Sequence, residues 1–417
     1  MDQAILVGLN LSQNNEAVHV SLDELEQLGL ALGIETKAKI IQNALRPTPK
    51  YYIGSGKVEE IKQLITIHDI DMVIFDDTLS PAQIKNLEKD LDVQVLDRSF
   101  LIMSVFAIRA QTKEAKLEVA LAQKTYMLPR LVGMGHVLSR QGGGTFNAKG
   151  PGETQLELDR RKILREIYQI KQELAKIKKE NEVSRKRRVK NQIPVVALVG
   201  YTNSGKSSLM NALSKKLEHP SDLVFEKDML FATLSTKSKR LQKENMPPFI
   251  LIDTVGFVDK LPVELIRSFE ATLSDVTQAD LLLHIVDGAT FSEHHIDVTK
   301  MILTSIQADK IERILVLTKK DLATEIPIIN DDSLFISNKT GENIDDLISA
   351  IYGHLYKGSR IFQLLIPFDS GHIYSELKTN NTILETQFKE DGTHLKAILT
   401  TEQERLYQPY LVHKKGV

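Results

Sequence analysis

The sequence contains no cysteine among its 417 residues. This absence excludes disulfides, thiolate zinc sites, iron–sulfur clusters and a cysteine nucleophile. It agrees with a reducing compartment, so we expect a cytoplasmic protein. No apolar stretch approaches the ~20 residues that a membrane span needs. Asp2 and Gln3 after Met1 do not resemble the start of a signal peptide. The sequence therefore predicts neither a membrane span nor a secreted protein.

An excess of charge of one sign is also missing. Lys and Arg number 53 and Asp and Glu number 55, which gives a net charge of -2. A nucleic-acid site would therefore have to be a local basic patch. Apolar residues make up 42% of the chain, an ordinary value that allows buried cores. The 11 His residues show no H-E-x-x-H spacing, so no zinc site is expected.

Four regions differ in pattern along the chain. Residues 1–110 alternate short apolar runs with helical patterns, which predicts an N-terminal α/β domain with a largely parallel sheet. Residues 111–190 predict a helical hairpin that carries a Gly-rich loop. Residues 191–357 alternate again and predict a doubly wound α/β domain, and residues 358–417 predict a small α+β domain.

Short apolar runs and periodic stretches place the expected elements. The expected strands are 4–7, 38–41, 72–75, 93–96, 195–199, 249–252, 281–286, 314–317, 334–336, 362–367, 382–388 and 394–399. The expected helices are 22–32, 58–68, 81–91, 114–128 and a long charged helix after Pro151. Ser80 before Pro81 predicts a helix start, because Ser caps a helix and Pro fits its first position.

The sharpest motif is a phosphate-binding loop that follows an apolar strand and precedes a helix. It reads Gly200-Tyr201-Thr202-Asn203-Ser204-Gly205-Lys206-Ser207 and matches G-x-x-x-x-G-K-[ST] in full. The glycines let backbone N–H groups face the phosphates, Lys206 reaches the β- and γ-phosphates, and Ser207 offers its hydroxyl to Mg²⁺. A second piece, Gly54-Ser55-Gly56-Lys57, lacks the first Gly and the final Ser or Thr, and predicts only a turn with Gly at positive φ.

Two later pieces contribute candidate groups around Mg²⁺ and the γ-phosphate. The first is Asp253-Thr254-Val255-Gly256, which ends an apolar strand. Its carboxylate can hold Mg²⁺, and the Gly256 N–H can reach the γ-phosphate. The second is Phe231-Ala232-Thr233-Leu234, where Thr233 can complete the Mg²⁺ coordination. Thr236 and Thr202 compete with Thr233 for that role.

The base-binding candidates follow the next two strands. They are Thr318-Lys319-Lys320-Asp321 and Ser337-Asn338-Lys339. Asp321 can accept from the N1–H and N2–H₂ of guanine, whereas adenine presents an acceptor at N1. The Lys319 stem can cover the face of the base. The second piece can close over the base.

Taken in their order along the chain (200–207, 231–234, 253–256, 318–321 and 337–339), the five motifs resemble a translation-factor-type GTPase. Their flanks resemble the HflX family of ribosome-associated GTPases. The flanking pieces are Arg109-Ala110-Gln111-Thr112, Leu128-Pro129-Arg130-Leu131 and Gly150-Pro151-Gly152-Glu153-Thr154-Gln155. The likeness covers about residues 1–357. It implies GTP hydrolysis and binding to the large ribosomal subunit and its rRNA. It also implies splitting or rescue of stalled ribosomes under stress, and some members are tied to antibiotic resistance.

The chain departs from the family pattern at two positions. Thr318 replaces the usual Asn, which we expect to weaken one brace of the base-binding loop, and Asn338 replaces the usual Ala. Phe257 stands where many GTPases place a water-orienting Gln, so we expect slow hydrolysis that a partner accelerates. The resemblance suggests that Asn203 helps to bind K⁺, although a turn-forming Asn is an equal alternative. The expected catalytic residues are Lys206, Thr233, Gly256 and Asn203.

A basic segment and the Gly-rich loop are the candidate rRNA contacts. From residue 153 to 190, 13 Lys and Arg accompany 7 Asp and Glu, and the densest run is Arg185-Lys186-Arg187-Arg188. Such clusters bind nucleic-acid phosphates, but a solvated linker has the same composition. The loop carries Arg140, Phe146 and Lys149, which suits insertion into an RNA cavity, or it serves as a hinge. By resemblance, this loop approaches the peptidyl transferase centre.

The combined pattern predicts a monomeric GTP/GDP switch that docks on the large ribosomal subunit. One alternative is the GTPase module of an RNA-modifying or ribosome-assembly protein, although residues 1–190 show no constellation of acid, base or nucleophile. A second is an RNA-binding protein with a vestigial nucleotide site, against which Lys206, Ser207 and Asp253 argue. A third is the same fold with ATP, which Thr318 leaves open.

Overall fold

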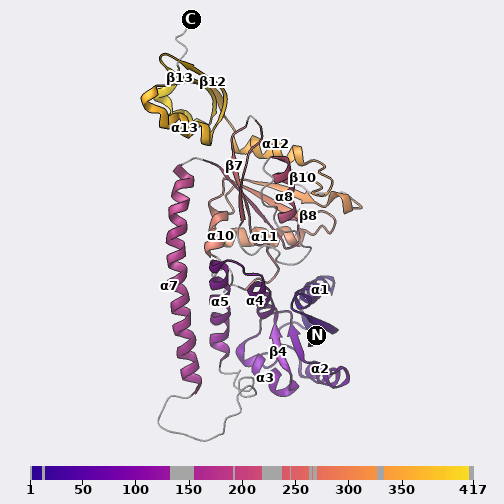
Figure 1. Ribbon diagram of the computed structural model, residues 1–417. Helices are drawn as coiled ribbons and strands as arrows, with labels where there is room; N and C mark the ends of the chain where they lie inside the picture. Colours follow the sequence, from indigo (N-terminus) through magenta and orange to yellow (C-terminus); the bar gives the residue numbers. More distant parts are fainter. Residues whose placement is uncertain are drawn as a thin grey trace. The chain divides into compact units, whose positions relative to one another are not determined.

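The computed structural model describes residues 2–11, 15–131, 155–190, 193–217, 237–244, 246–262, 265, 270–325 and 333–412. These residues fall into two compact units, whose elements are labelled in Figure 1. The first unit contains the described parts of 1–178 and 258–271. The second contains those of 179–228, 235–257 and 272–417. The finer division into four domains stays a prediction.

The first unit is built on a parallel sheet of the order β2-β1-β3-β4. Its strands are β1 (Asp2–Asn10), β2 (Ile34–Asn43), β3 (Met72–Phe75) and β4 (Gln94–Asp97). The helices α1 (Asn15–Ala31), α2 (Ser55–His68) and α3 (Pro81–Leu91) connect them. Ile5, Val73 and Phe75 are completely buried in its core. The predicted N-terminal α/β fold is therefore confirmed.

Two helix starts in this unit test the local predictions. The Ser80 hydroxyl accepts from the Gln83 N–H at 3.3 Å, and the Gln83 side chain accepts from the Ser80 N–H at 2.9 Å. This reciprocal cap confirms the predicted start at Pro81. Gly54 caps α2 with φ −72°, so the prediction of positive φ is wrong there. The reason is that an N-cap residue takes an extended conformation.

A helical hairpin follows the sheet. Its helices are α5 (Lys113–Met127) and α7 (Gln155–Lys190). Lys124 pairs with Glu166, and Lys113 Nζ lies 3.1 Å from Glu173 Oε2, so the two helices run antiparallel, as predicted. The preceding helix α4 (Arg98–Arg109) was not predicted. Its sequence is apolar on most sides because most of the helix is buried, which hides the helical period.

The second unit contains a six-stranded sheet of the order β10-β9-β8-β5-β7-β6. The strands are β5 (Val195–Gly200), β6 (Lys237–Leu241), β7 (Phe249–Asp253), β8 (Leu281–Asp287), β9 (Arg313–Thr318) and β10 (Ser333–Phe335). The helices are α8 (Lys206–Lys216), α10 (Glu270–Thr277), α11 (Glu293–Ser305) and α12 (Ile344–Leu355). The sheet is parallel except for its edge strand β6, which the sequence did not predict because four of its five residues are polar.

The strand order decides where a ligand can bind. The first strand, β5, lies between β7 and β8, so the chain winds away from β5 in both directions. In doubly wound sheets, ligands bind outside the carboxyl ends of the strands at this switch point. The carboxyl end of β5 is Gly200, the first residue of the predicted phosphate loop.

The last part of the chain forms the predicted small α+β fold. The strands β11 (Arg360–Ile366), β12 (Thr382–Lys389) and β13 (Gly392–Leu399) form an antiparallel sheet with α13 (Gly371–Asn380) and α14 (Thr401–Leu406). Short 3-10 helices span Leu128–Arg130, Lys320–Leu322, Phe368–Ser370 and Gln408–Tyr410. None of the helices described for this chain has the length and apolarity that crossing a membrane requires.

Candidate nucleotide-binding site

The phosphate loop connects β5 to α8 through two glycines that no other residue could replace without strain. Gly200 has φ 149°, and a Cβ there would lie 2.1 Å from the Ile285 carbonyl oxygen. Gly205 has φ 91° and precedes the first residue of α8. The first N–H groups of a helix have no partner inside the helix and favour an anion. The loop is therefore shaped to present main-chain N–H groups to phosphates.

Lys206 is buried inside this loop. Its Nζ donates to the carbonyl oxygens of Tyr201 at 2.6 Å and Gly200 at 3.0 Å, and the residue is only 6% exposed. Burial lowers the pKa of Lys206 to about 8, and the Asp253 carboxylate opposes that shift. The ammonium is thus held by the carbonyl groups of the loop itself, with its charge only weakly balanced.

Two oxygen donors predicted for the metal meet beside the loop. Asp253 ends β7, the neighbour of β5, and the Ser207 hydroxyl donates to Asp253 Oδ2 at 2.8 Å. Hard divalent cations prefer such oxygens. No group of three or more His, Asp or Glu suited to a metal occurs within the described residues. These two oxygens therefore fit a cation that shares its other ligands with a nucleotide. The third candidate, Thr233, lies outside the described residues, with Phe231, Ala232 and Leu234.

The D-T-V-G segment lies against the phosphate loop. A Cβ added at Gly256 would be 2.9 Å from the Thr202 Cα and 3.0 Å from the Lys206 Nζ. The Thr254 hydroxyl donates to the Leu198 carbonyl and fixes the segment to β5. Only glycine fits at this approach, so the main chain of residue 256 comes close to the place where a terminal phosphate would meet Lys206.

Phe257 continues this contact through its main chain. Its N–H donates to the Gly200 carbonyl at 3.0 Å, and its carbonyl accepts from the Thr202 N–H at 2.7 Å. Its side chain is only 2% exposed. The ring is therefore a packing group and does not present a polar atom to water.

Thr318 makes the brace that its replacement of Asn was expected to weaken. At the end of β9 the Thr318 hydroxyl donates to the Ser204 carbonyl at 2.7 Å, with a longer contact of 3.3 Å to the Val286 carbonyl. The side chain is completely buried. The Thr318 hydroxyl is thus long enough to reach and brace the phosphate loop, and that this brace is weaker than the usual Asn would make stays a prediction.

Asn338 supplies a second brace to the same loop. Its Nδ2 donates to the Gly205 carbonyl at 3.2 Å. The neighbouring Ser337 hydroxyl donates to Asp321 Oδ1 at 2.6 Å and orients that exposed carboxylate. The two motifs predicted to bind the base, around residues 318 and 338, therefore both contact the phosphate loop. Lys339 is exposed in the same turn.

Sequence reasoning missed two residues beside the site. Asp287 ends β8, and its Oδ2 pairs with Lys319 Nζ at 2.8 Å, while Lys319 has a left-handed φ of 58°. An acid at the end of a buried apolar strand was the signal for Asp287. The ring of His295 on α11 stacks on Tyr201 at a centroid distance of 3.9 Å. No pattern in the sequence points to that contact.

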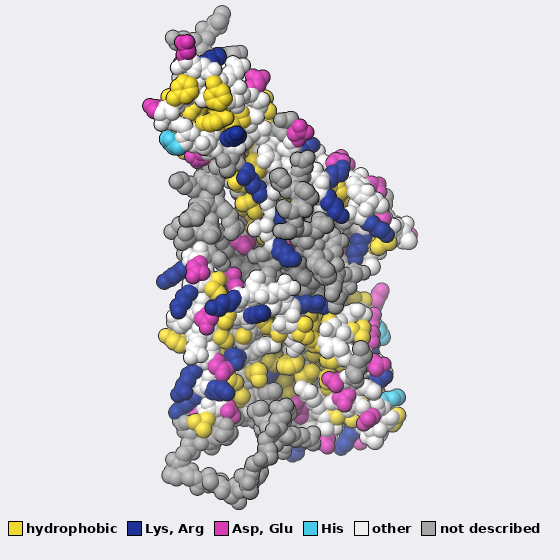
Figure 2. All heavy atoms as spheres, in the orientation of Figure 1, with side chains coloured by type: hydrophobic (Ala, Val, Ile, Leu, Met, Phe, Trp, Pro, Cys, Tyr) yellow, Lys and Arg dark blue, Asp and Glu magenta, His cyan; other side chains and the backbone are white. Residues whose placement is uncertain are grey.

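The candidate rRNA residues are only partly described. Arg185, Lys186, Arg187 and Arg188 lie near the end of the α7 backbone, whereas Arg140, Phe146 and Lys149 lie outside the described residues. Basic and acidic side chains intermingle along α7 (Figure 2), where Arg160 and Arg161 both lie within 4 Å of Glu157. The acids of α7 therefore balance part of its basic charge before the dense run begins.

Comparisons with known proteins identify the family. Three family models match successive parts of the chain: GTP-binding GTPase N-terminal at 19–107, GTP-binding GTPase Middle Region at 109–188, and 50S ribosome-binding GTPase at 195–319. GTPase HflX of Caldanaerobacter subterraneus subsp. tengcongensis is 42% identical over 407 residues, which cover 97% of this chain and 93% of that protein. The chain belongs to the HflX family of GTPases.

A second curated relative agrees with this assignment. GTPase HflX of Escherichia coli K12 is 36% identical over 400 residues, covering 94% of this chain and 92% of that protein. A solved structure of SsGBP with GDP covers 84% of this chain and 98% of its own, with 25% identity and a TM-score of 0.44. As a member of the HflX family, the chain binds GTP and GDP and hydrolyses GTP to GDP and phosphate. Its nucleotide site belongs to a class that works with a divalent metal.

We predict that GDP binding takes up protons when the solution is more alkaline than pH 8. Below the pKa of about 8, Lys206 already carries its charge, and binding takes up nothing. Above it, the neutral Lys206 amine must take up a proton when phosphate binds, so the affinity falls by at most about tenfold per pH unit. Calorimetry at pH 8.5 in two buffers of different ionisation enthalpy measures the uptake. The control variant, Lys216→Arg, should show the same proton uptake as the wild type. Proton release on GDP binding by the wild type would contradict the role of Lys206.

We also predict that Thr318→Val weakens GDP binding by roughly tenfold, because one hydrogen bond to the phosphate loop is lost and the Ser204 carbonyl stays buried. Thr318→Ser keeps the hydroxyl and should stay within about threefold of the wild type. Fluorescence titration with a labelled GDP measures both variants. If the valine variant binds as tightly as the serine variant, the hydroxyl brace does not support the site.

Proposed function

We propose that this GTPase binds the large ribosomal subunit in its GTP state and splits or rescues stalled ribosomes. Bound GTP favours docking on the subunit, and hydrolysis to GDP favours release. The observation that carries the proposal is the arrangement of α7 and the phosphate site along one chain. The dense basic run 185–188 ends a helix that leads directly into β5, the strand that carries the phosphate loop. The proposed nucleic-acid contact at 185–188 is therefore separated from the strand of the nucleotide site by only a few residues of sequence.

The nucleotide site supports a GTP-dependent switch. In our proposal the amides of the loop 200–207 hold the phosphates, Lys206 contacts the β- and γ-phosphates, and Mg²⁺ is bound by Ser207, Thr233 and Asp253. The close approach of Gly256 to Lys206 supports a role in sensing the γ-phosphate. GTP would then order the segments around Thr233 and Gly256, and hydrolysis would release them.

Recognition of guanine is assigned to the carboxyl ends of β9 and β10. Asp321 accepts from N1–H and N2–H₂, Lys319 covers the base, and Ser337, Asn338 and Lys339 close over it. The orientation of Asp321 by the Ser337 hydroxyl supports this assignment. An adenine in the same place would oppose its N1 lone pair to the carboxylate, so we propose GTP rather than ATP as the substrate.

Hydrolysis is proposed to be slow until the ribosome is bound. Phe257 has no polar side-chain atom and is packed away from solvent, so it cannot orient the attacking water as a Gln does. Lys206 and the metal stabilise charge on the phosphates, but the water is left without a positioned acceptor among the described residues of this motif. A group supplied with the ribosome would complete the site.

Contact with rRNA is proposed for the hairpin. The basic run 185–188 would neutralise phosphates, and Arg140, Phe146 and Lys149 of the Gly-rich loop would enter an RNA cavity, where Phe146 can stack on a base. The family description as a 50S ribosome-binding GTPase supports the large subunit as the partner. An RNA-modifying function would need a second reactive pocket, and nothing in the sequence of residues 1–190 points to one.

We predict that the protein co-sediments with large ribosomal subunits in the presence of a non-hydrolysable GTP analogue and much less with GDP. Replacing Lys186, Arg187 and Arg188 with Gln removes three charges from the basic run. We expect a loss of at least about tenfold in affinity and a salt dependence reduced by roughly two to three in log–log slope. The matched control replaces Lys62, Lys85 and Lys89, which are exposed on α2 and α3, and should bind as the wild type does. Equal binding with GDP and with the analogue would contradict the switch.

We further propose that K⁺ bound near Asn203 stimulates hydrolysis. Asn203 is exposed in the phosphate loop and has φ 59°, a left-handed conformation that glycine adopts without strain. Asn203→Gly tolerates this backbone and removes the side chain with its amide oxygen. The hydrolysis rate of the wild type should be several-fold higher in KCl than in NaCl, and the variant should show no difference. Identical rates of the wild type in both salts would remove K⁺ from the account.

A further inference from the structure

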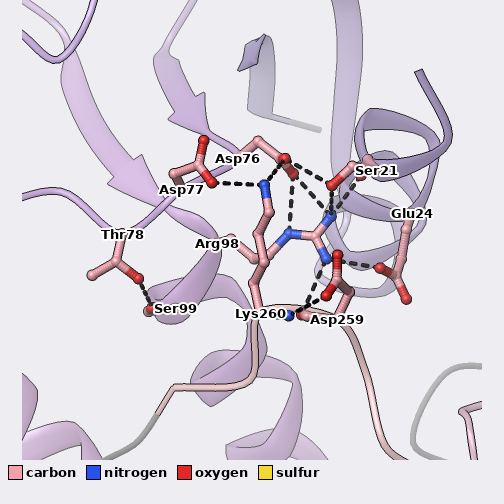
Figure 3. A network of polar contacts seen from close by, with 9 residues as sticks. All are labelled: Ser21, Glu24, Asp76, Asp77, Thr78, Arg98, Ser99, Asp259 and Lys260. Atoms are coloured by element: carbon pink, nitrogen blue, oxygen red, sulfur yellow. Dashed lines mark hydrogen bonds and ion pairs between the residues drawn. The ribbon is translucent and has the colours of Figure 1, made fainter. Parts of the chain in front are cut away.

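A polar network in the first unit includes residues that follow the D-T-V-G motif (Figure 3). Asp76 and Asp77 lie just after β3, at its carboxyl end. Lys260 forms ion pairs with both carboxylates and lies 2.7 Å from Asp77 Oδ1. Asp76 is only 2% exposed. The lysine therefore reaches one buried and one half-buried carboxylate.

Arg98 fixes Asp76 from a second direction. The Arg98 Nε donates to Asp76 Oδ1 at 3.0 Å, and its Nη1 donates to Glu24 Oε2 at 2.7 Å. Its Nη2 donates to the Ser21 carbonyl at 2.6 Å, and the Ser21 hydroxyl donates to Asp76 Oδ2 at 2.7 Å. Arg98 is only 1% exposed. Lys260 thus meets a preformed acceptor, in contrast to a mobile carboxylate on a surface.

Lys260 supplies one of the two basic groups that pair with the carboxylates of the network. Glu24, Asp76, Asp77 and Asp259 contribute four carboxyl groups to the network, and Arg98 and Lys260 contribute its two basic groups. Burial by itself raises the pKa of Asp76, but Arg98 and Lys260 outweigh it and lower the pKa. The pKa of Lys260 is raised by the two aspartates against the effect of burial. Loss of Lys260 would remove one of the two cations that pair with the buried Asp76 carboxylate and leave only Arg98.

The position of Lys260 in the chain connects this network to the nucleotide site. Phe257, the residue after Gly256, exchanges two main-chain hydrogen bonds with the phosphate loop, at 2.7 and 3.0 Å. Val258 is completely buried, and Lys260 has φ 54°, a left-handed conformation that costs a lysine free energy. The segment is therefore held at Phe257 by the phosphate loop and at Lys260 by the acid pair, with two residues between.

The acid pair occupies a place that commonly binds ligands. The carboxyl edge of a parallel α/β sheet is where such domains usually take up small molecules, and Asp76 and Asp77 stand at that edge. In this chain the Lys260 ammonium pairs with both aspartates at that edge. The ion pairs of Lys260 with Asp76 and Asp77 can therefore restrain residues 256–260, the segment that carries Lys260.

We propose that Lys260 is a positioning residue for GTP hydrolysis: its pairing with Asp76 and Asp77 holds Gly256 where its N–H meets the γ-phosphate. Lys260 acts through the main chain of residues 256–260 and does not touch the nucleotide. GDP lacks the γ-phosphate, so its binding does not use this restraint. The proposal rests on the nucleotide site proposed above and is independent of ribosome binding.

The test compares nucleotide affinities and single-turnover hydrolysis in the full-length protein without ribosomes. Lys260→Met should weaken binding of a non-hydrolysable GTP analogue by about fivefold or more and slow hydrolysis by a similar factor, with GDP affinity nearly unchanged. Lys260→Arg should keep most of the wild-type preference for the GTP analogue over GDP, because the arginine can still pair with Asp76 and Asp77. Asp77→Asn should act in the same direction, and combining it with Lys260→Met should add little, since one interaction is lost in both.

The control is Lys39→Met, because Lys39 also pairs with two acids of the first unit, Asp23 at 2.5 Å and Glu26 at 2.7 Å. It should leave the preference for the GTP analogue over GDP unchanged. If Lys260→Met weakens GDP and the analogue equally, or if Lys39→Met has the same effect, Lys260 is only structural and the inference is overturned. A wild-type protein that binds no guanine nucleotide would overturn the nucleotide site and the inference with it.

Discussion

Lys206 lies in a cage of main-chain carbonyl groups at the switch point of a parallel sheet, and the nucleotide site is arranged around it. Gly200 and Gly205 turn the chain so that these carbonyls face inward and the helix amides face outward. Burial leaves the ammonium short of balancing charge, which a phosphate supplies. Asp253, Gly256 and Thr318 are each placed by a strand end beside this loop.

Much of this arrangement could be predicted, because it depends on short-range patterns. The phosphate loop follows from eight consecutive residues, and the meeting of the two oxygens proposed for the metal follows from the parallel sheet that sets Asp253 beside Ser207. Patterns failed where environment overrides periodicity. Helix α4 is buried on most sides and shows no amphipathic period, and β6 is an edge strand of polar residues. Gly54 takes ordinary negative φ because it caps a helix.

Contacts between distant residues could not be predicted from one sequence. The hydroxyl of Thr318 donates to the Ser204 carbonyl, which lies 114 positions earlier in the chain. Lys260 pairs with Asp76 across 184 positions, and no motif includes either residue. Both contacts depend on side-chain length at a strand end or a turn. Which distant partner such a side chain meets has no signature in composition or spacing, because it depends on how the chain folds.

The most direct test of the account is calorimetry of the purified wild-type protein with GDP and with ATP in the presence of Mg²⁺, repeated with Lys206→Met. The account predicts one GDP per chain, far weaker binding of ATP, and loss of GDP binding in the variant. Binding of ATP as tightly as GDP, or undiminished GDP binding without the Lys206 ammonium, would contradict it.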